Sequence, residues 1–422
     1  MDCTAYLGFE NVGQGLFYRG IVNLGSKTQF SFVYDCGSIS REYYLQDAIT
    51  SVRDKLNRRL DILIISHFHE DHVNGVTNLI KGIHVRKLVL PYINWVERLT
   101  IYLATNSSDQ NYNSFITDPI SFLSSGEFEI DEIIVVGAPD EPASGTNLIR
   151  PNPIEPLSSN QSDLNVDDYF SNQIGSDVRI ESIGIQKAIN PSDPYFENFT
   201  FTTLDRAILS FYSTPFAFSI IPFWEFQFYL LESGNKTVLE MFQEEVEKLI
   251  KKEGIIWRNL FDQKYRERLR GLYKKYYGNL NQTSLITYHA PTKEISIFHS
   301  YNMVKIGVLS RQFRFNIRKG TLLTGDIKMT QEYLLNQICN YFSFFWQCIG
   351  VFLIPHHGAK ANWNFKHPND LENFELYVVS SGLGRRNHPS IDVLEDIYIN
   401  CNGEILHCTE ITDFYYHFKF EL

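Results

Sequence analysis

The sequence predicts an α/β protein in which helices pack on sheets, and three observations support this. Strand patterns alternate with helical patterns over residues 40–137, an order that is typical of layered α/β domains. The same alternation resumes at Asn281 and continues toward the C-terminus. The pattern changes between these two regions. We therefore expect two α/β halves, residues 1–140 and 281–422, with an insertion at 141–280.

The first half is predicted to begin with strands in which apolar and polar residues alternate. Residues 5–35 hold two or three such runs separated by glycines, which favours antiparallel pairing. A helix follows, with Ser40 as its N-cap candidate, and then a fully buried strand. The expected elements are a helix at 40–57, a strand at 60–67, a helix at 73–83, a strand at 85–93, a helix at 95–106 and a strand at 130–137.

The segment 141–280 is predicted to change from loop to strand to helix. Residues 138–168 are rich in Pro, Ser, Asn and Asp, which is typical of loops. Residues 169–232 include the most apolar stretch, 211–231, whose prolines and polar residues favour buried strands over a membrane span. Residues 236–277 place apolar side chains at helical spacing.

The second half repeats the alternation of strands and helices. Its strands are mostly apolar, as expected for strands that are covered on both faces. The expected elements are a strand at 284–290, one or two strands at 307–327, a helix at 330–342, strands at 348–358 and 376–382, a helix at 389–400 and strands at 404–411 and 415–422.

Composition argues against a long nucleic-acid footprint and against a disulfide scaffold. The net charge is -11, so a large basic face is not expected, although a small site in which cations neutralise a phosphate is compatible with this charge. The six cysteines include no CxxC pair, so we expect them to be reduced and mostly buried. No secretory signal pattern opens the sequence, and we expect a cytoplasmic protein without membrane contact.

The stretch "ILIISHFHEDHVNG" places five metal-binding side chains directly after a buried strand. His67 and His69 point to the same side because side chains alternate along a strand. Asp71 and His72 follow in the turn that opens the next helix. Imidazole and carboxylate ligands suit Zn²⁺, Mn²⁺ or Fe. Glu70 faces away on this geometry, so we expect it to have a structural role.

Further acidic and imidazole side chains follow strands of the second half. Asp326 ends "LLTGD", His356 and His357 end "FLIPHHG", and His388 lies in a loop before a helix. Open α/β sheets tend to build their sites at the carboxyl ends of strands. A carboxylate such as Asp326 can bridge two cations about 3.5–4 Å apart. We therefore expect one or two Zn²⁺ ions per chain, with Mn²⁺ as the alternative.

With these motifs the chain resembles the metallo-β-lactamase fold superfamily. More narrowly, it resembles the metallo-hydrolase domain of bacterial competence DNA-uptake channel proteins and its stand-alone relatives. The motifs "NVGQGL", "FVYDCG", HxHxDH, "NQTSL", "LLTGD", "PHHG" and "HP" carry the resemblance over residues 5–140 and 281–410. The chain departs from the family pattern at Leu16, where an acid is usual, and at Ala359, where Ser is common. The His that other branches place near "NQTSL" is also missing.

The resemblance implies a four-layer αββα sandwich, with the site at one edge between the two sheets. It implies that His67 and His69 bind a first metal ion and that Asp71 and His72 bind a second. The other implied roles are a bridging ligand for Asp326, a second-site ligand for His388, a ligand or proton donor for His356 or His357, and supporting positions behind the ligands for Asp35 and Asn281.

The implied reaction is hydrolysis by a water that the metal activates, with Asp71 as a candidate proton acceptor. The resemblance favours phosphodiester substrates, namely DNA, RNA or nucleotides. Arg385 and Arg386 are candidate phosphate ligands, and Lys360 is a weaker one. The alternatives are a hydrolase of small esters, lactones or thioesters, and a non-catalytic assembly partner of a defence-type system that binds another protein through residues 140–280.

Two further features have ordinary structural interpretations. The basic run from Lys264 to Lys275 is either a contact for nucleic acid or a partner protein, or one solvated helix face. The remaining histidines are isolated in the sequence, and we do not expect them to bind a metal. They are His84, His289, His299, His367, His407 and His417.

Overall fold

The computed structural model describes most of the chain. The described residues are 2–25, 28–105, 107–139, 178–190, 193, 195–196, 207–221, 223–231, 236–276, 283–292, 296–306, 309–313, 318–364 and 373–421. Asn281, His367 and most of the predicted loop at 138–168 lie outside these ranges.

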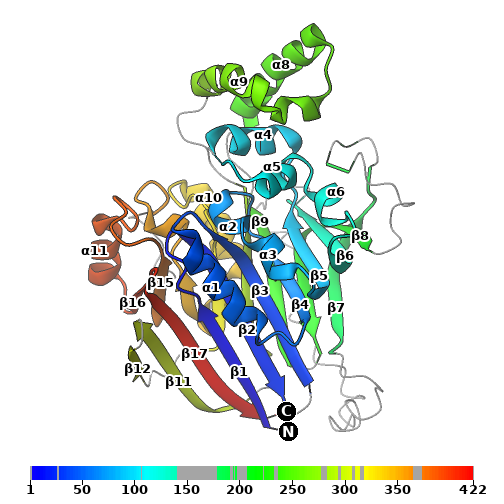
Figure 1. The fold of residues 1–422 in the computed structure, drawn as a ribbon. Helices are drawn as coiled ribbons and strands as arrows, with labels where there is room; N and C mark the ends of the chain where they lie inside the picture. Colours follow the sequence, from blue (N-terminus) through cyan, green and yellow to red (C-terminus); the bar gives the residue numbers. More distant parts are fainter. Residues whose placement is uncertain are drawn as a thin grey trace.

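The hydrogen-bonded strands of the described residues form one continuous sheet that folds into two layers. These layers, called the first and second sheet below, form the centre of the molecule, and the first is built around the strands of the N-terminal half (Figure 1). Strands β3 to β6 run parallel to one another. Strands β2, β1, β17, β11 and β12 extend the sheet in antiparallel order, with Asp2 opposite Glu421. Their bounds are β1 Asp2–Phe9, β2 Gly15–Leu24, β3 Thr28–Ser38, β4 Arg59–Ile64, β5 His84–Pro91, β6 Glu129–Gly137, β11 Ser296–Ile306, β12 Leu309–Phe313 and β17 Thr412–Glu421.

The second sheet carries most strands of the C-terminal half. Strand β10 pairs antiparallel with β9 on one side and with β13 on the other, and β13 to β16 run parallel. Parallel neighbours require a crossover connection, which contains α10 between β13 and β14 and α11 between β15 and β16. The bounds are β9 Trp224–Leu231, β10 Ser284–Pro291, β13 Gly320–Leu323, β14 Ile349–Leu353, β15 Leu376–Ser380 and β16 Glu404–Cys408.

Strand β8 (Ile208–Ile220) belongs to both sheets. Its first part, up to Ser213, pairs in parallel with β6, and its second part, from Phe216, pairs antiparallel with β9. Strand β7 (Ile180–Lys187) pairs with β8 as well. Strands β8 and β9 lie inside the predicted insertion at 141–280, so this part of the segment contributes to the sandwich itself. The three-part division of the chain remains a prediction.

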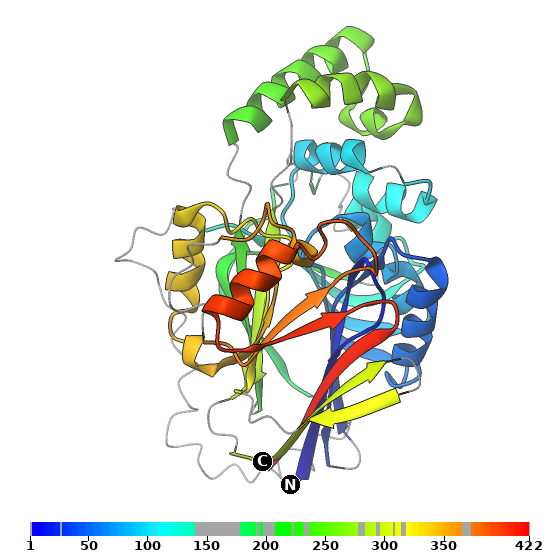
Figure 2. The same cartoon turned by 90° about the vertical axis from the view of Figure 1, so that its left-hand side faces the viewer.

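Helices cover the outer faces of the two sheets. Figure 2 shows the molecule edge-on, with α10 and α11 on the side of the second sheet and α1 on the side of the first. The bounds are α1 Glu42–Arg53, α2 Glu70–Val73, α3 Val76–Ile80, α4 Trp95–Ala104, α5 Gln110–Thr117, α6 Pro119–Leu123, α10 Glu332–Phe342 and α11 Ile391–Asn400.

Three hydrophobic cores separate these layers. Strand β4 shows how one sequence supplies two of them, because its side chains alternate between the faces of the sheet. Ile62 and Ile64 lie in the core between the two sheets, whereas Leu63 lies in the core beneath the helices of the first half. The third core packs Phe352 of the second sheet with Ile338 of α10. The predicted αββα sandwich is therefore confirmed.

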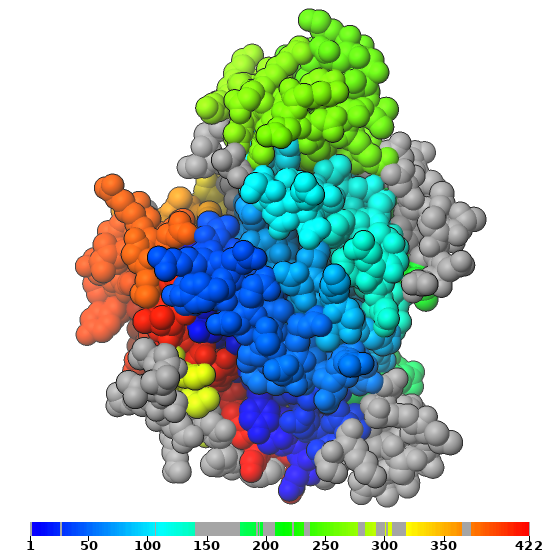
Figure 3. Space-filling view, viewed as in Figure 1, coloured from blue at the N-terminus to red at the C-terminus, as the bar shows by residue number. Residues whose placement is uncertain are grey.

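A helical extension stands on α4, at the top of Figures 1 and 3. It consists of α8 (Lys236–Glu253), a 3₁₀ turn (Trp257–Phe261) and α9 (Gln263–Tyr276). Phe242 and Leu269 are fully buried in the same core as the helices of the first half. The extension is therefore anchored to the sandwich through apolar contacts, and its use as a surface for a protein partner remains a prediction.

The predicted basic run lies on α9, and part of it is used inside the protein. Arg266 is buried, with its guanidinium over the ring of Tyr102, and it donates hydrogen bonds to the carbonyl oxygens of Tyr102 and Thr105. Arg270 donates to the carbonyl oxygens of Leu103 and Thr105. These carbonyls end α4, where a cation is favourable. Two of the basic side chains thus hold α9 on α4.

Among the described residues, no helix combines the length and the apolar character that crossing a membrane requires. The cysteines are mostly buried, which confirms the prediction made for them. The buried ones are Cys3, Cys36, Cys339, Cys401 and Cys408, and Cys348 is half-buried.

Candidate metal centre

The two halves of the chain meet where their strands end. Beyond the end of β4, the carbonyl oxygen of Ser66 accepts a hydrogen bond of 2.8 Å from the backbone N–H of Leu285 in β10. Tyr34 of β3 donates to the carbonyl oxygen of the same Leu285 across 3.1 Å. These contacts bring the segment that follows β4 next to the segments that follow β13 and β14. Side chains from both halves therefore converge at this edge.

Asp326 is buried at the centre of this convergence. Its Oδ2 lies 3.3 Å from Nε2 of His67, 3.8 Å from Nδ1 of His69 and 3.7 Å from Nε2 of His356. Its Oδ1 lies 3.3 Å from Nε2 of His72. The single carboxylate of Asp326 is thus shared by two groups of histidines, as the predicted bridging role requires.

Asp71 and His357 complete the group around His72. Nε2 of His357 lies 3.1 Å from Oδ2 of Asp71, and the rings of His72 and His357 are 5.5 Å apart. One ligand atom from each of Asp71, His72 and His357 can lie within 4.8 Å of the others, and the same holds for His67, His69 and Asp326. The same holds for Asp35, His67 and His72, so neighbouring groups of residues in the described part of the chain could each hold a cation.

Oxygen acceptors behind the histidines define which ring nitrogen carries the proton. Nδ1 of His72 donates to Oδ2 of Asp35 across 2.8 Å, and Nδ1 of His357 donates to the carbonyl oxygen of Ser380 across 2.6 Å. The hydroxyl of Ser66 donates to Asp35 across 2.6 Å and so accepts from Nδ1 of His67 across 2.8 Å. In each neutral ring Nε2 is therefore the nitrogen with the free lone pair.

With this assignment, hydrogen-bond acceptors of the histidines face the acceptor oxygens of Asp326 in the protein interior. Nε2 of His67 and His72 meet the oxygens of Asp326, although two lone pairs cannot form a hydrogen bond. Both Nε2 atoms and Oδ1 of Asp326 are buried and have no hydrogen-bond partner. Burying such atoms unsatisfied costs several kcal/mol, so the cluster favours a positive charge between them, either a bound cation or a proton on His72. Imidazole nitrogen and carboxylate oxygen are a donor set that Zn²⁺ prefers, and these residues fit it.

The charges of the cluster shift its pKa values in opposite directions. Burial lowers the pKa of His67 to about 3. Burial also opposes protonation of His72, but Asp326 and Asp35 raise the pKa of this imidazole well above its usual value. Burial alone would raise the pKa of Asp326, yet the histidines around it, led by His356, hold that pKa well below its usual value. The cluster therefore favours ionised carboxylates together with a compensating cation.

The backbone is strained where it presents these ligands. Asp35, His356 and His357 have positive φ angles of 55°, 49° and 55°, a region that costs non-glycine residues about 1–3 kcal/mol each. At Gly37 a Cβ atom would lie 2.5 Å from the backbone of His72. Only a glycine in "FVYDCG" allows α2 to approach β3 this closely.

His388, predicted as a ligand, comes to the same edge of the sheets but stands apart from both groups. Its ring centre is 5.5 Å from that of His356 and 6.2 Å from that of His357. It is not part of the His/Asp groups found among the described residues. Its Nδ1 lies 3.4 Å from Nε2 of Gln14.

The predicted phosphate ligands lie on the surface near this edge. Arg385 is exposed and donates to the carbonyl oxygen of Ile39 across 3.2 Å. Arg386 is exposed in the same loop. Lys360 pairs with Asp392 across 2.7 Å.

Glu70 and most of the isolated histidines have structural partners. Glu70 accepts a hydrogen bond from Ser107 across 2.5 Å, consistent with a structural role. The described isolated histidines have partners outside the cluster: His84 pairs with Asp131, His289 with Tyr18 and His407 with Ser381, and His417 packs on Tyr6. The side chain of His299, like His367 and Asn281, lies outside what the structure describes.

The sequence left the roles of two site residues open and did not point to two others. It left the roles of His356 and His357 open, whereas the structure places His356 with the His67 group and His357 with Asp71. Ser66 and Gln14 were not singled out at all. The sequence signal for Ser66 is its position directly before the first histidine of the HxHxDH motif. The signal for Gln14 is the "VGQG" motif, but the residue that Gln14 contacts is too distant in sequence to be predicted from it.

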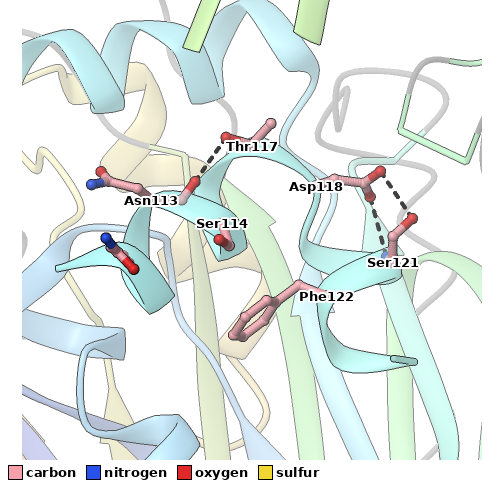
Figure 4. A pocket seen from close by; sticks show the side chains of 7 residues that line it. Asn113, Ser114, Thr117, Asp118, Ser121 and Phe122 are labelled. Atoms are coloured by element: carbon pink, nitrogen blue, oxygen red, sulfur yellow. Dashed lines mark hydrogen bonds between the residues drawn. The ribbon is translucent and has the colours of Figure 1, made fainter. Parts of the chain in front are cut away.

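A shallow pocket lies elsewhere, on α5 and α6. Figure 4 shows it between Asn113 and Thr117 of α5 and Ser121 and Phe122 of α6. Asp118, between the two helices, accepts hydrogen bonds from Ser121 and pairs with Arg258 across 2.9 Å. The pocket shares no residue with the histidine cluster, and Asp118 on its wall is the N-cap of α6.

Comparisons with known proteins give two structural similarities at low sequence identity. No family model matches the chain, and no curated protein matches it. The metallo-β-lactamase fold protein YhfI from Bacillus subtilis is similar over 97% of this chain and 98% of its own, with 9% identity and a TM-score of 0.35. A long form RNase Z from yeast is similar over 96% of this chain, with 8% identity and a TM-score of 0.31, and the chain spans only 36% of it.

These similarities are too weak to support an argument about activity. The fold is instead evident from the chain's own architecture. Helices flank two packed sheets, the HxHxDH segment follows a buried strand, and Asp326 of the other half completes the ligand cluster at the same edge. The chain therefore has the four-layer αββα architecture that its resemblance to the metallo-β-lactamase fold implies.

Proposed function

We propose that this protein is a metal-dependent hydrolase that acts on phosphodiester bonds. One observation carries the proposal. The buried Nε2 atoms of His67 and His72 face the carboxylate of Asp326 across 3.3 Å without a hydrogen-bond partner. A divalent cation in such a set lowers the pKa of water to about 7 and polarises the bond to be cleaved. Hydrolysis is the reaction class that this donor set supports best.

The residues of the chain divide the work in this proposal. His67, His69 and His356 would hold one cation together with Asp326. Asp71, His72 and His357, again with Asp326, would hold the other. Asp35 and the carbonyl oxygen of Ser380 fix the ring orientations from behind, a support that typically matters 10–100-fold for metal affinity or activity.

Surface groups near the cluster favour an anionic substrate. Arg385 and Arg386 follow β15 on the loop that also carries His388, and both side chains are exposed. A guanidinium can bind a phosphate through two parallel hydrogen bonds. Lys360 is the weaker candidate because Asp392 already pairs with it. The net charge of -11 argues for a short contact of this kind rather than an extended basic groove.

Metal analysis combined with activity assays tests the proposal. The purified chain is expected to carry one or two equivalents of Zn²⁺ or Mn²⁺ and to hydrolyse bis(p-nitrophenyl) phosphate, and DNA or RNA are assayed in parallel. Asp326→Asn should lower both the metal content and the turnover. Asp61→Asn is the matched control, because Asp61 is equally buried but bonds Ser31, away from the cluster.

The alternative functions give different outcomes in the same experiment. Turnover of lactones, esters or thioesters without turnover of phosphodiesters would indicate a small-molecule hydrolase of the same fold. Full metal loading without turnover of any substrate would indicate the non-catalytic partner protein. A protein that binds no divalent cation would contradict the proposed function outright.

A further inference from the structure

His388 sits beside the cluster with a hydrogen bond that differs from those of the other site histidines. His72 and His357 each donate through Nδ1 to an oxygen acceptor. His388 instead presents Nδ1 to the side-chain amide of Gln14, at 3.4 Å from Nε2. The contact joins the "VGQG" loop after β1 to the loop after β15. What it does to the imidazole depends on which end of the amide faces the ring.

The orientation of the Gln14 amide follows from its second contact. The backbone N–H of Gly382 donates to Oε1 of Gln14 across 3.3 Å. A backbone N–H can only donate, so this end of the amide must be the oxygen. The other end, which faces His388, is therefore the NH₂ group. An NH₂ group can only donate, so Nδ1 of His388 must be the acceptor and Nε2 of the neutral ring carries the proton.

Neighbouring contacts hold Gln14 in this position. Its backbone N–H donates to Oγ of Ser40 across 2.9 Å, and Ser40 donates to Glu410 across 2.7 Å. The other oxygen of Glu410 accepts from the backbone N–H of Leu383, next to Gly382, across 2.8 Å. The loop that carries Gln14 and the loop that carries His388 are thus tied together by one carboxylate.

We infer that Gln14 is a positioning residue that keeps His388 in its Nε2–H form, and that His388 donates a hydrogen bond to an oxygen of the bound substrate rather than binding metal. A metal ligand needs a free lone pair, and in this form Nδ1 shares its lone pair with Gln14 while Nε2 bears hydrogen. Within the described part of the chain, no protein atom hydrogen-bonds Nε2 of His388. The substrate contact in this inference rests on the proposed function, whereas the tautomer of His388 does not.

The tautomer is measurable in the full-length protein without any turnover. Long-range ¹H–¹⁵N spectra of the imidazoles distinguish the two neutral forms, and His388→Asn identifies the His388 signals. We expect Nε2–H in the wild type, with and without added Zn²⁺. In Gln14→Glu a carboxylate oxygen replaces the NH₂ group, so His388 should change to the Nδ1–H or the charged form. Gln29→Glu makes the same charge change near the start of β3, and it should leave the His388 signal unchanged.

Metal content separates a substrate contact from a metal ligand. His388→Ala should keep the wild-type ratio of metal to protein and lower kcat about 100-fold, as expected for one lost hydrogen-bond donor. Gln14→Glu should lower kcat about 10-fold or more with its metal retained. An Nδ1–H signal in the wild type, or metal loss in His388→Ala, would overturn the inference. If the proposed function is wrong, the wild-type protein will bind no metal. The tautomer of His388 can still be measured in that case.

Discussion

Oδ2 of Asp35 accepts a hydrogen bond of 2.8 Å from Nδ1 of His72, and the same oxygen accepts one of 2.6 Å from the hydroxyl of Ser66. Oδ1 of Asp35 accepts a hydrogen bond of 2.7 Å from the backbone N–H of Ser66. One buried carboxylate on β3 therefore orients both His72 and, through Ser66, His67. The two proposed cation sites depend on a residue that contributes no ligand atom.

Replacing Asp35 by Asn should weaken metal binding while leaving the fold in place. The amide can accept from Ser66 or His72 but presents an N–H to the other, so one of the two contacts is lost. We expect a 10–100-fold lower Zn²⁺ affinity, measured by competition with a chromophoric chelator. Asp61→Asn makes the same substitution in a buried carboxyl on the neighbouring strand β4. Equal affinities in the two variants would show that Asp35 does not support the site.

Single substitutions of His356 and His357 should empty different sites. His356 lies with His67 and His69 around Oδ2 of Asp326, whereas His357 faces Asp71. Each alanine variant should therefore lose about one equivalent of metal in a two-site protein, and the double variant should lose both. Titration followed by elemental analysis measures this. If both single variants lost the same site, the assignment of the two histidines to separate groups would be wrong.

Gly37→Ala should disturb the ligands on α2 more than it disturbs the rest of the fold. The new Cβ would lie 2.5 Å from the backbone of His72, so α2 must move away from β3. We expect loss of metal from the Asp71–His72 group and a lower Tm. Gly271→Ala on α9 adds a Cβ with nothing within 4 Å and should leave metal content unchanged. Normal metal content in Gly37→Ala would contradict the close approach.

Asp413 provides a pH test that does not involve the metal centre. Burial, with Glu10 adding to it, raises the pKa of Asp413 to about 6. The folded protein thus binds this proton more tightly than the unfolded chain, so the stabilisation is complete below about pH 4 and is lost as the pH rises to about 6. Asp413→Asn should raise stability at pH 7 by about 1 kcal/mol, and this gain should vanish near pH 4 in thermal unfolding scans.

The layers and the ligand types were predictable because they follow from local periodicity. The unbroken apolar run at Ile62, Leu63 and Ile64 predicts a strand covered on both faces, and the structure buries these residues in two different cores. The HxHxDH spacing after such a strand brings its ligands to one edge without further information. Asp326 is equally readable, since "TGD" follows an apolar run.

The division of roles inside the site was not predictable, since it depends on backbone angles and long-range contacts. His356 and His357 are neighbours in sequence, and their positive φ angles turn the two rings toward different carboxylates. Gln14 meets His388 only because β1 and β15 end near each other in the fold. Arg266 looks like one more solvated cation in a basic run, yet it is buried against the end of α4.

Strand β8 limits how this protein can be dissected. Its hydrogen bonds continue from β6 in one sheet to β9 in the other. Deleting residues 141–280 as if they were a separable domain would cut the ladder that couples the two sheets, and the histidines of one half would lose their fixed distance from Asp326 of the other. A shortened form of the protein would have to retain β8 and β9 to keep the residues of the proposed cation sites assembled.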